Sequence, residues 1–213
     1  MNISTESFLI QSKLWPSSGR HILAHFDENS IVVYQAYCPQ IGNYAAKHGR
    51  FGGTFGLNRM SWVKPNFLWM MYRSGWGTKE GQEVTLAIRL SREFWGEILS
   101  QAVPSSFARE LYESKAEWQS EVENSEVRLQ WDPDHGPHHE KLERRAIQIG
   151  LRGEIIRRYA NEALEIEDIS DFVAEQRQHV LNGQLEKLET PSERVFQPQN
   201  TETRHRLRLA KEE

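Results

Sequence analysis

Hydrophobic and polar positions alternate along several short segments of the chain, which is typical of strands that bury one face. The segment 30–37 (SIVVYQAY) is rich in β-branched and aromatic residues and follows the polar turn Asp27-Glu28-Asn29. In segment 83–90, Val84, Leu86, Ile88 and Leu90 share one side. The pattern predicts strands at 30–37, 60–63, 83–90, 126–131 and 144–151.

Between these segments, apolar residues recur at the spacing of helices. Pro39 suits a first helical turn, and Asn66 and Ser91 are good N-cap residues. Phe67, Met70 and Met71 then lie on one helical face. The pattern predicts helices at 39–49, from Asn66 to Ser74, at 91–102, at 153–164 and at 168–188.

The order of these elements indicates the fold class. Strands and helices alternate only in the first half, and several linkers are shorter than the dozen or so residues that parallel strands need. We therefore expect an α+β fold with a mixed, mostly antiparallel sheet and flanking helices. Residues 1–190 are predicted to form a single domain, and the polar segment 191–213 a flexible tail.

Composition and charge narrow the classes of protein. The chain has 213 residues, a net charge of −4 and a pI near 6.1, so any polyanion would have to be held by a local patch. Cys38 is the only cysteine, which excludes an intrachain disulfide. No stretch approaches the roughly 18 apolar residues of a membrane span, and the start lacks a signal-peptide pattern. We expect a cytoplasmic protein with no membrane partner.

Aromatic and basic residues are concentrated between Arg59 and Trp76. Six of the seven tryptophans lie between Trp62 and Trp131. Rings beside cations can stack on a base or nicotinamide while the cations pair with phosphate. The alternative, about equally favoured, is a helix packed by its aromatics with solvated cations. The candidate ligand contacts in this segment are Arg59, Trp62, Lys64, Tyr72 and Arg73.

Polar residues on the predicted strands supply further candidates. Gln35 lies near a strand end beside Tyr34 and Tyr37, and its amide could both donate to and accept from a ribose or an amide edge. Arg128 and Gln130 share one strand face, and Gln148 lies between Ile147 and Ile149 on the later strand. Buried polar groups need partners, so these residues indicate either a polar cleft or a structural network.

Other patterns of reactive residues carry little weight. His135 and His139 have the spacing of a metalloprotease pair, but Gly136 and Pro137 lie between them and argue against a helix there. An exposed turn is therefore favoured over a metal site. Cys38 is interpreted as an inert thiol rather than a nucleophile beside His48. The residues of that turn are Asp132, Asp134, His135, His138 and His139.

The longest distinctive run, KPNFLWMMYRSGW at 64–76, resembles the family catalogued as domain of unknown function 4291. It is preceded by VVYQAY at 32–37 and followed by VRLQWDP at 127–133 and IQIGL at 147–151. The resemblance spans roughly residues 30–159. The name of that family implies no activity.

A more distant resemblance, in the order of the pieces, is to the ADP-ribosyltransferase fold. Tyr34-Gln35-Ala36 looks like the motif on the first strand of that fold. Segment 61–63, which leads into the next helix, looks like the part that cradles nicotinamide. Segment 126–131 looks like the late strand that bears a catalytic glutamate. Gln35 stands where His or Arg is usual, and Ala36 replaces a glycine. The resemblance implies NAD as co-substrate. Gln35 would hold the ribose, and Glu126 or Gln130 would orient the acceptor.

The resulting hypothesis is an NAD-dependent ADP-ribosyltransferase-like protein that modifies an unknown acceptor, a nucleic acid or a protein. The alternative is a non-catalytic RNA- or nucleotide-binding module that uses the same cleft, and a third is an interaction domain with tryptophans in its core. The predicted catalytic residues are Gln35, Glu126 and Gln130. The predicted cofactor-binding residues are Tyr34, Tyr37, Arg59, Trp62, Lys64, Tyr72, Arg73, Arg128 and Gln148; no metal ligand is predicted.

Overall fold

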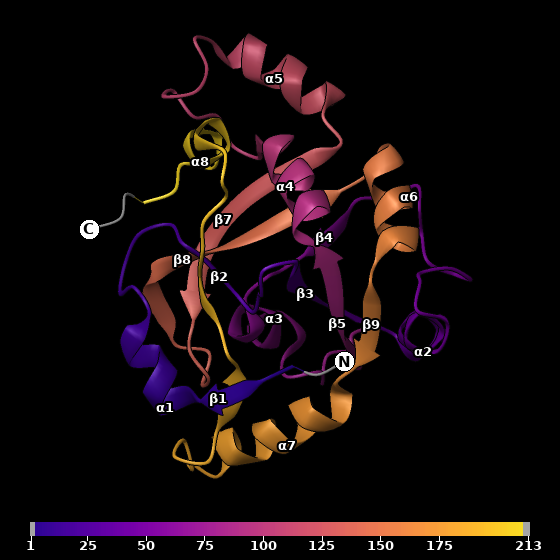
Figure 1. Ribbon diagram of the computed structural model, residues 1–213, viewed down its shortest axis with the longest axis vertical. Helices are drawn as coiled ribbons and strands as arrows, with labels where there is room; N and C mark the ends of the chain where they lie inside the picture. The colour runs from indigo at the N-terminus through magenta and orange to yellow at the C-terminus, as the bar shows by residue number, and fades with distance from the viewer. Residues whose placement is uncertain (1–2, 211–213) are drawn as a thin grey trace.

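Two main sheets organise the chain in the computed structural model, which describes residues 3–210 (Figure 1). All their pairs are antiparallel except β6 with β7, so the predicted mixed α+β class with mostly antiparallel strands is confirmed. The three-stranded sheet has the order β3 (Ser30–Tyr37), β5 (Val84–Ser91) and β9 (Glu165–Asp168). The four-stranded sheet has the order β4 (Ser61–Val63), β8 (Lys141–Leu151), β7 (Val127–His135) and β6 (Val103–Pro104).

A single pair of residues connects the two sheets through their backbones. The N–H of Tyr34 on β3 donates to the carbonyl of Lys64 at 2.7 Å, and the N–H of Lys64 donates back to Tyr34 at 3.2 Å. Pro65 follows at once and cannot donate to a ladder, so pairing ends there. The bridge therefore fixes Lys64 at the junction of the sheets.

Helices cover the sheets, and α3 begins and ends where the sequence predicts. Asn66 caps α3 by accepting the N–H of Trp69 at 2.7 Å, and Gly75, with φ of 59°, ends the helix. Figure 1 shows α5 at one end of the molecule and α7 at the other. The helices are α1 (Phe8–Gln11), α2 (Pro39–His48), α3 (Phe67–Ser74), α4 (Arg92–Ser100), α5 (Lys115–Asn124), α6 (Gly153–Glu162), α7 (Ser170–Leu181) and α8 (Thr201–Leu207).

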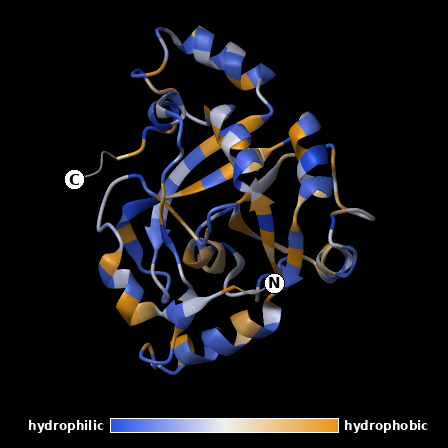
Figure 2. Cartoon of the chain, viewed as in Figure 1, coloured by the Kyte–Doolittle hydropathy of each residue, from blue (hydrophilic) through white to orange (hydrophobic). Residues whose placement is uncertain are grey.

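The two faces of β3 are buried in separate cores. Ile31 and Val33 join the larger core, which also holds the inward residues of β5, β7 and β8 together with α4 and α6. Val32 and Tyr34 join a second core beneath α3 and α7. Figure 2 shows hydrophobic and hydrophilic residues alternating along β7 and β8. β3 is therefore a central strand, and the polar face of β7 and β8 lies opposite the larger core.

Several elements differ from the prediction. α5 was not predicted, and α7 ends at Leu181 instead of residue 188. The strand expected to end at Trp131 continues through Pro133, with a register irregularity between Pro133 and His135. β6 pairs only with residues 128 and 129, so Pro133 lies where the outer edge of β7 has no partner strand and its missing N–H is tolerated. The predicted helix 168–188 begins only at Ser170, because Glu165–Asp168 pairs with β5 as β9.

The segment predicted to be a flexible tail forms two short strands and a helix that ends at Leu207, and its last residues, 211–213, lie outside the described part. The predicted boundary at residue 190 falls inside β10 (Glu189–Pro191), which pairs with β1 (Thr5–Ser7). β11 (Arg194–Phe196) pairs with β2 (Ile22–Ala24), and α8 follows. These pairings join the two ends of the chain, and short polar strands of this kind carry almost no periodic signal.

Glu193 ties this C-terminal segment to α3. Its buried carboxylate accepts the N–H of Phe67 at 2.7 Å and the side-chain amide of Asn66 at 3.1 Å. Burial raises the pKa of Glu193 well above its ordinary value. The start of α3 therefore depends on a residue more than one hundred positions away.

Within the described residues, no helix combines the length and the hydrophobicity needed to cross a bilayer.

We predict that Glu193→Ala lowers the free energy of unfolding by about 2–3 kcal/mol, because it leaves the first N–H of α3 buried and unpaired. Glu193→Gln keeps one acceptor and should cost less. Urea denaturation measures both, with the exposed Glu186→Ala as the control expected to stay within about 0.5 kcal/mol of wild type. Equal effects of Glu193→Ala and Glu186→Ala would contradict this role.

Candidate functional site

The polar face of β7 and β8 holds the candidate site. Successive side chains on a strand point to opposite faces, so Arg128, Gln130 and Asp132 share a face opposite Leu129 and Trp131. The register places Gln130 directly opposite Gln148 on β8. Two glutamines and a carboxylate therefore meet on a face that the larger core does not use.

Asp132 is the centre of this group. The side-chain amide of Gln130 donates to one carboxylate oxygen at 2.9 Å, and that of Gln148 donates to the other at 2.7 Å. Both donors are neutral, so they orient the carboxylate without neutralising its charge. Asp132 is half-buried, and its charge stays available to a cation at this face.

Lys64 brings an amine to the same region. Its side chain is only 6% exposed, and Nζ donates to the carbonyl of Trp62 at 3.3 Å. Burial, reinforced by the nearby Arg73 guanidinium, lowers the pKa of Lys64 to about 7, while Asp132 acts in the opposite direction. An amine of this pKa can gain or lose a proton near neutral pH, which is typical of functional lysines.

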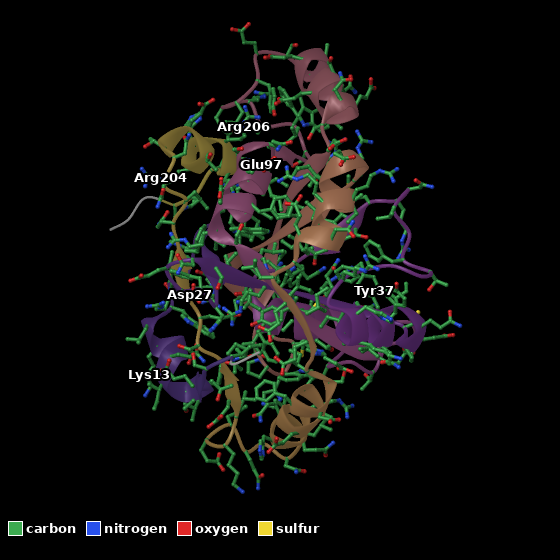
Figure 3. All side chains as sticks on the ribbon, turned by 45° about the vertical axis from the view of Figure 1, so that its right-hand side comes forward. Lys13, Asp27, Tyr37, Glu97, Arg204 and Arg206 are labelled. Carbon is green, nitrogen blue, oxygen red and sulfur yellow. The ribbon has the colours of Figure 1, made fainter. Side chains whose placement is uncertain are left out.

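A hydrogen-bond network beneath Lys64 uses the amide of Gln35. Its nitrogen donates to the Trp62 carbonyl at 3.1 Å, and its oxygen accepts the hydroxyl of Tyr159 at 2.8 Å. The Trp62 carbonyl thus receives bonds from both Gln35 and Lys64. Tyr37 ends β3 beside α2 (Figure 3), and burial raises its pKa to about 12. Both ends of the Gln35 amide are engaged within the protein, so Gln35 positions the strand that carries Lys64.

The aromatics of α3 pack mainly against the end of β7. The rings of Tyr72 and His135 are stacked with centroids 3.5 Å apart, and Trp69 lies 5.3 Å from Tyr72. The exposed Arg73 guanidinium lies 5.9 Å from the Trp69 ring. Trp62 is half-buried over Gly150, where an added Cβ would come within 3.1 Å of its ring. Within α3, therefore, the aromatic side chains of segment 59–76 pack within the protein, which is the second of the two interpretations given for that segment.

The structure brings together some of the predicted site residues and separates others. Lys64, Gln130 and Gln148 lie around Asp132, and Gln35 and Trp62 support them. The Glu126 carboxylate accepts the N–H groups of Glu154 and Ile155 at 2.9 and 3.0 Å, so it caps α6.

Three further predicted residues lie apart from Asp132. The Arg128 guanidinium donates to the carbonyls of Ser125 and Val122. Tyr34 is buried against Phe67 in the second core, and Arg59 is exposed in the loop before β4.

Sequence reasoning missed Asp132 as the centre of the site because it ended the strand at Trp131. Continuing the alternation of Arg128 and Gln130 by two residues would have found it. Among the described residues, no three His, Cys, Asp or Glu side chains are grouped so that they could hold a metal ion.

The arrangement combines a fixed carboxylate with an amine that is close to half-protonated at neutral pH. The carboxylate can stabilise positive charge that develops on a bound molecule, and the amine can accept or donate a proton. Gln130, Asp132 and Trp62 remain partly exposed, so a ligand can approach this face from solvent.

We predict that Lys64→Met is more stable relative to wild type at pH 6 than at pH 10. Wild type must bury an ammonium group at low pH, and this cost disappears as pH rises from about 7 to the ordinary lysine pKa of 10.5. The stability difference should fall by up to about 1.4 kcal/mol per pH unit across that range. Urea denaturation at several pH values measures it, and the exposed Lys187→Met should show no such trend. A constant difference for Lys64→Met would refute the lowered pKa.

Comparison with known proteins yields one family match. The family described as "Domain of unknown function (DUF4291)" matches residues 21–196, which include both main sheets and every residue around Asp132. A search of curated proteins finds no match. The match covers well over half of the chain, and we conclude that it belongs to the DUF4291 family.

Proposed function

We propose that the protein binds NAD at the site formed by Lys64, Asp132, Gln130 and Gln148, called here the Lys64–Asp132 group. It then transfers ADP-ribose to an acceptor, in the manner of the ADP-ribosyltransferase fold. The observation that carries the proposal is a buried amine of pKa about 7 that feels the charge of a carboxylate held by two glutamine amides. The location at the bridge between two antiparallel sheets supports it.

Asp132 suits the bond-breaking step of such a transfer. The bond between the nicotinamide nitrogen and ribose C1′ breaks, and its electron pair leaves with nicotinamide, which becomes neutral. The positive charge moves to the ribose as an oxocarbenium ion, which a nearby carboxylate stabilises. Because Gln130 and Gln148 fix both oxygens of Asp132, the carboxylate needs little reorganisation during this charge movement.

Lys64 suits the proton transfer that completes the reaction. An acceptor hydroxyl or amine forms a new bond to C1′ and must lose a proton. With a pKa near 7, a substantial fraction of Lys64 is neutral at physiological pH and can take that proton. The Gln35 amide and the Trp62 carbonyl would keep the amine in place.

Side chains around this pair are suited to the rest of NAD. Trp62 is half-buried on the same face and offers a ring for nicotinamide or adenine to stack on. Arg73 is exposed and acts electrostatically on Lys64, and its guanidinium group can pair with the pyrophosphate. In this arrangement Asp132, and not the predicted Glu126, is the catalytic carboxylate, because Glu126 caps α6.

We predict that wild type binds NAD and releases nicotinamide, and that Asp132→Asn lowers the release rate at least about 100-fold while changing the NAD dissociation constant less than about threefold. Calorimetry measures binding, and chromatography of nicotinamide measures the reaction with water or protein as acceptor. The exposed Glu143→Gln is the matched control and should retain wild-type activity.

Two outcomes would overturn the proposal. One is a folded wild-type protein that shows no binding of NAD. The other is nicotinamide release that is equal in wild type, Asp132→Asn and Glu143→Gln. Melting temperatures of the variants separate a catalytic effect from a loss of folding.

The second candidate function is non-catalytic binding of RNA or a nucleotide by the same face. The exposed cation Arg73 favours it, because its guanidinium group can meet phosphate without any reaction. Binding of RNA whose affinity falls steeply with salt, without nicotinamide release, would support this alternative.

A further inference from the structure

Three arginines from distant parts of the chain surround a small hollow on the other face of β7 and β8. Arg20 precedes β2, Arg145 belongs to β8, and Arg208 follows α8. Backbone bonds hold them together: the N–H of Arg145 donates to Gly19 at 2.8 Å, and the N–H of Ala210 donates to Arg20 at 3.0 Å. All three side chains line the hollow.

The opposite wall of the hollow comes from β7 and the loop after β6. Ser105, Ser106 and Trp131 line it, and Ser105 is held by its N–H and its hydroxyl, which bond to the Leu129 carbonyl at 2.7 and 2.8 Å. The indole N–H of Trp131 donates to the Leu207 carbonyl at 2.9 Å, which fixes the segment that carries Arg208. Figure 1 shows this C-terminal segment alongside β7 and β8. The hollow is thus built by five separate segments.

Positive charge in the hollow exceeds negative charge among the described residues. Arg208 forms an ion pair with Glu110, which is half exposed. Burial lowers the pKa of Arg20, and so do Arg208 and Arg145, while the Glu110 carboxylate acts in the opposite direction. The Nε atoms of Arg20 and Arg208 are buried, and neither has a hydrogen-bond partner in the described part of the chain. Buried donors of this kind normally have an acceptor.

Size and position separate this hollow from the Lys64–Asp132 group. Its volume is about 190 Å³, below the roughly 300 Å³ of pockets that hold drug-sized ligands, so it suits a single small anionic group. Gln130 lines the hollow and also contacts Asp132, but the charged side chains lie on opposite faces of the strands: Arg145 projects from the odd-numbered face and Asp132 from the even-numbered face.

We propose that Arg20, Arg145 and Arg208 form a second binding site, which takes a phosphate group. Guanidinium forks match the oxygens of a phosphate, and three of them converge here. The exposed Ser106 hydroxyl can add a hydrogen bond. The group is either free phosphate or the terminal phosphate of a nucleotide or nucleic acid, and both present the same oxygens.

Calorimetric titration of the full chain with inorganic phosphate tests this site. We expect wild type to bind with a dissociation constant of about 1 mM or tighter. Arg145→Ala should weaken binding at least about tenfold, and Arg145→Lys should weaken it less because it keeps the charge and loses the fork. Arg145 is exposed, so its substitution should leave the melting temperature close to that of wild type.

Control variants show whether the loss of phosphate affinity comes from the three arginines of the hollow. The exposed Arg50→Ala removes the same charge far from the hollow in sequence and should leave phosphate affinity within about twofold. Asp132→Asn should also leave it unchanged, which separates this site from the proposed NAD site. Absence of phosphate binding below about 10 mM, or equal weakening by Arg145→Ala and Arg50→Ala, would overturn the proposal.

Further titrations identify the source of the phosphate group. Tighter binding of AMP, or of a 5′-phosphorylated oligonucleotide than of its 5′-hydroxyl counterpart, would assign an esterified phosphate. Equal affinity for inorganic phosphate and AMP would assign the free ion. Equal binding of the two oligonucleotides without competition by inorganic phosphate would count against the site.

Discussion

The two hydrogen bonds between Tyr34 and Lys64 are the constraint on which the rest of the structure depends, because they join two otherwise separate sheets. The larger core holds apolar residues of both sheets, and the bridge brings those residues together. It also places the Lys64 side chain where water is largely excluded. Burial of an amine is costly unless the amine loses its proton, so the same contact that completes the fold also lowers the pKa of Lys64.

The polar groups near the bridge support one another. The Trp62 carbonyl accepts from Lys64 and Gln35, while Gln130 and Gln148 orient Asp132. A network of this kind specifies one arrangement of the strands, which is its structural value. It also leaves an amine and a carboxylate preorganised on a partly exposed face, which is the property that the proposed transfer of ADP-ribose would use. The three arginines on the reverse face would give the same pair of strands a second, separate role.

Strong local patterns made much of the fold predictable. The alternation in 30–37, the Asn66 cap and the Gly75 stop correspond closely to β3 and α3. Contacts between distant segments were not predictable: β10 and β11 pair with the N-terminal strands, and Glu193 completes the start of α3. Within the site, Gln130 and Gln148 stood out as polar residues on apolar strands, and Lys64 as a cation in the aromatic segment 59–76. The capping role of Glu126 could not be predicted from the sequence, because the helix that it caps begins 27 residues later at Gly153.

The pKa of Lys64 tests the central claim most directly. NMR titration of a chain labelled with ¹³C at the lysine ε-carbons follows each amine separately, and the signal missing from Lys64→Met identifies Lys64. The account predicts a midpoint of about 7 for this signal. A midpoint near the ordinary value of 10.5 would contradict the burial of the amine at the junction of the two sheets and, with it, the proposed role of Lys64 in proton transfer.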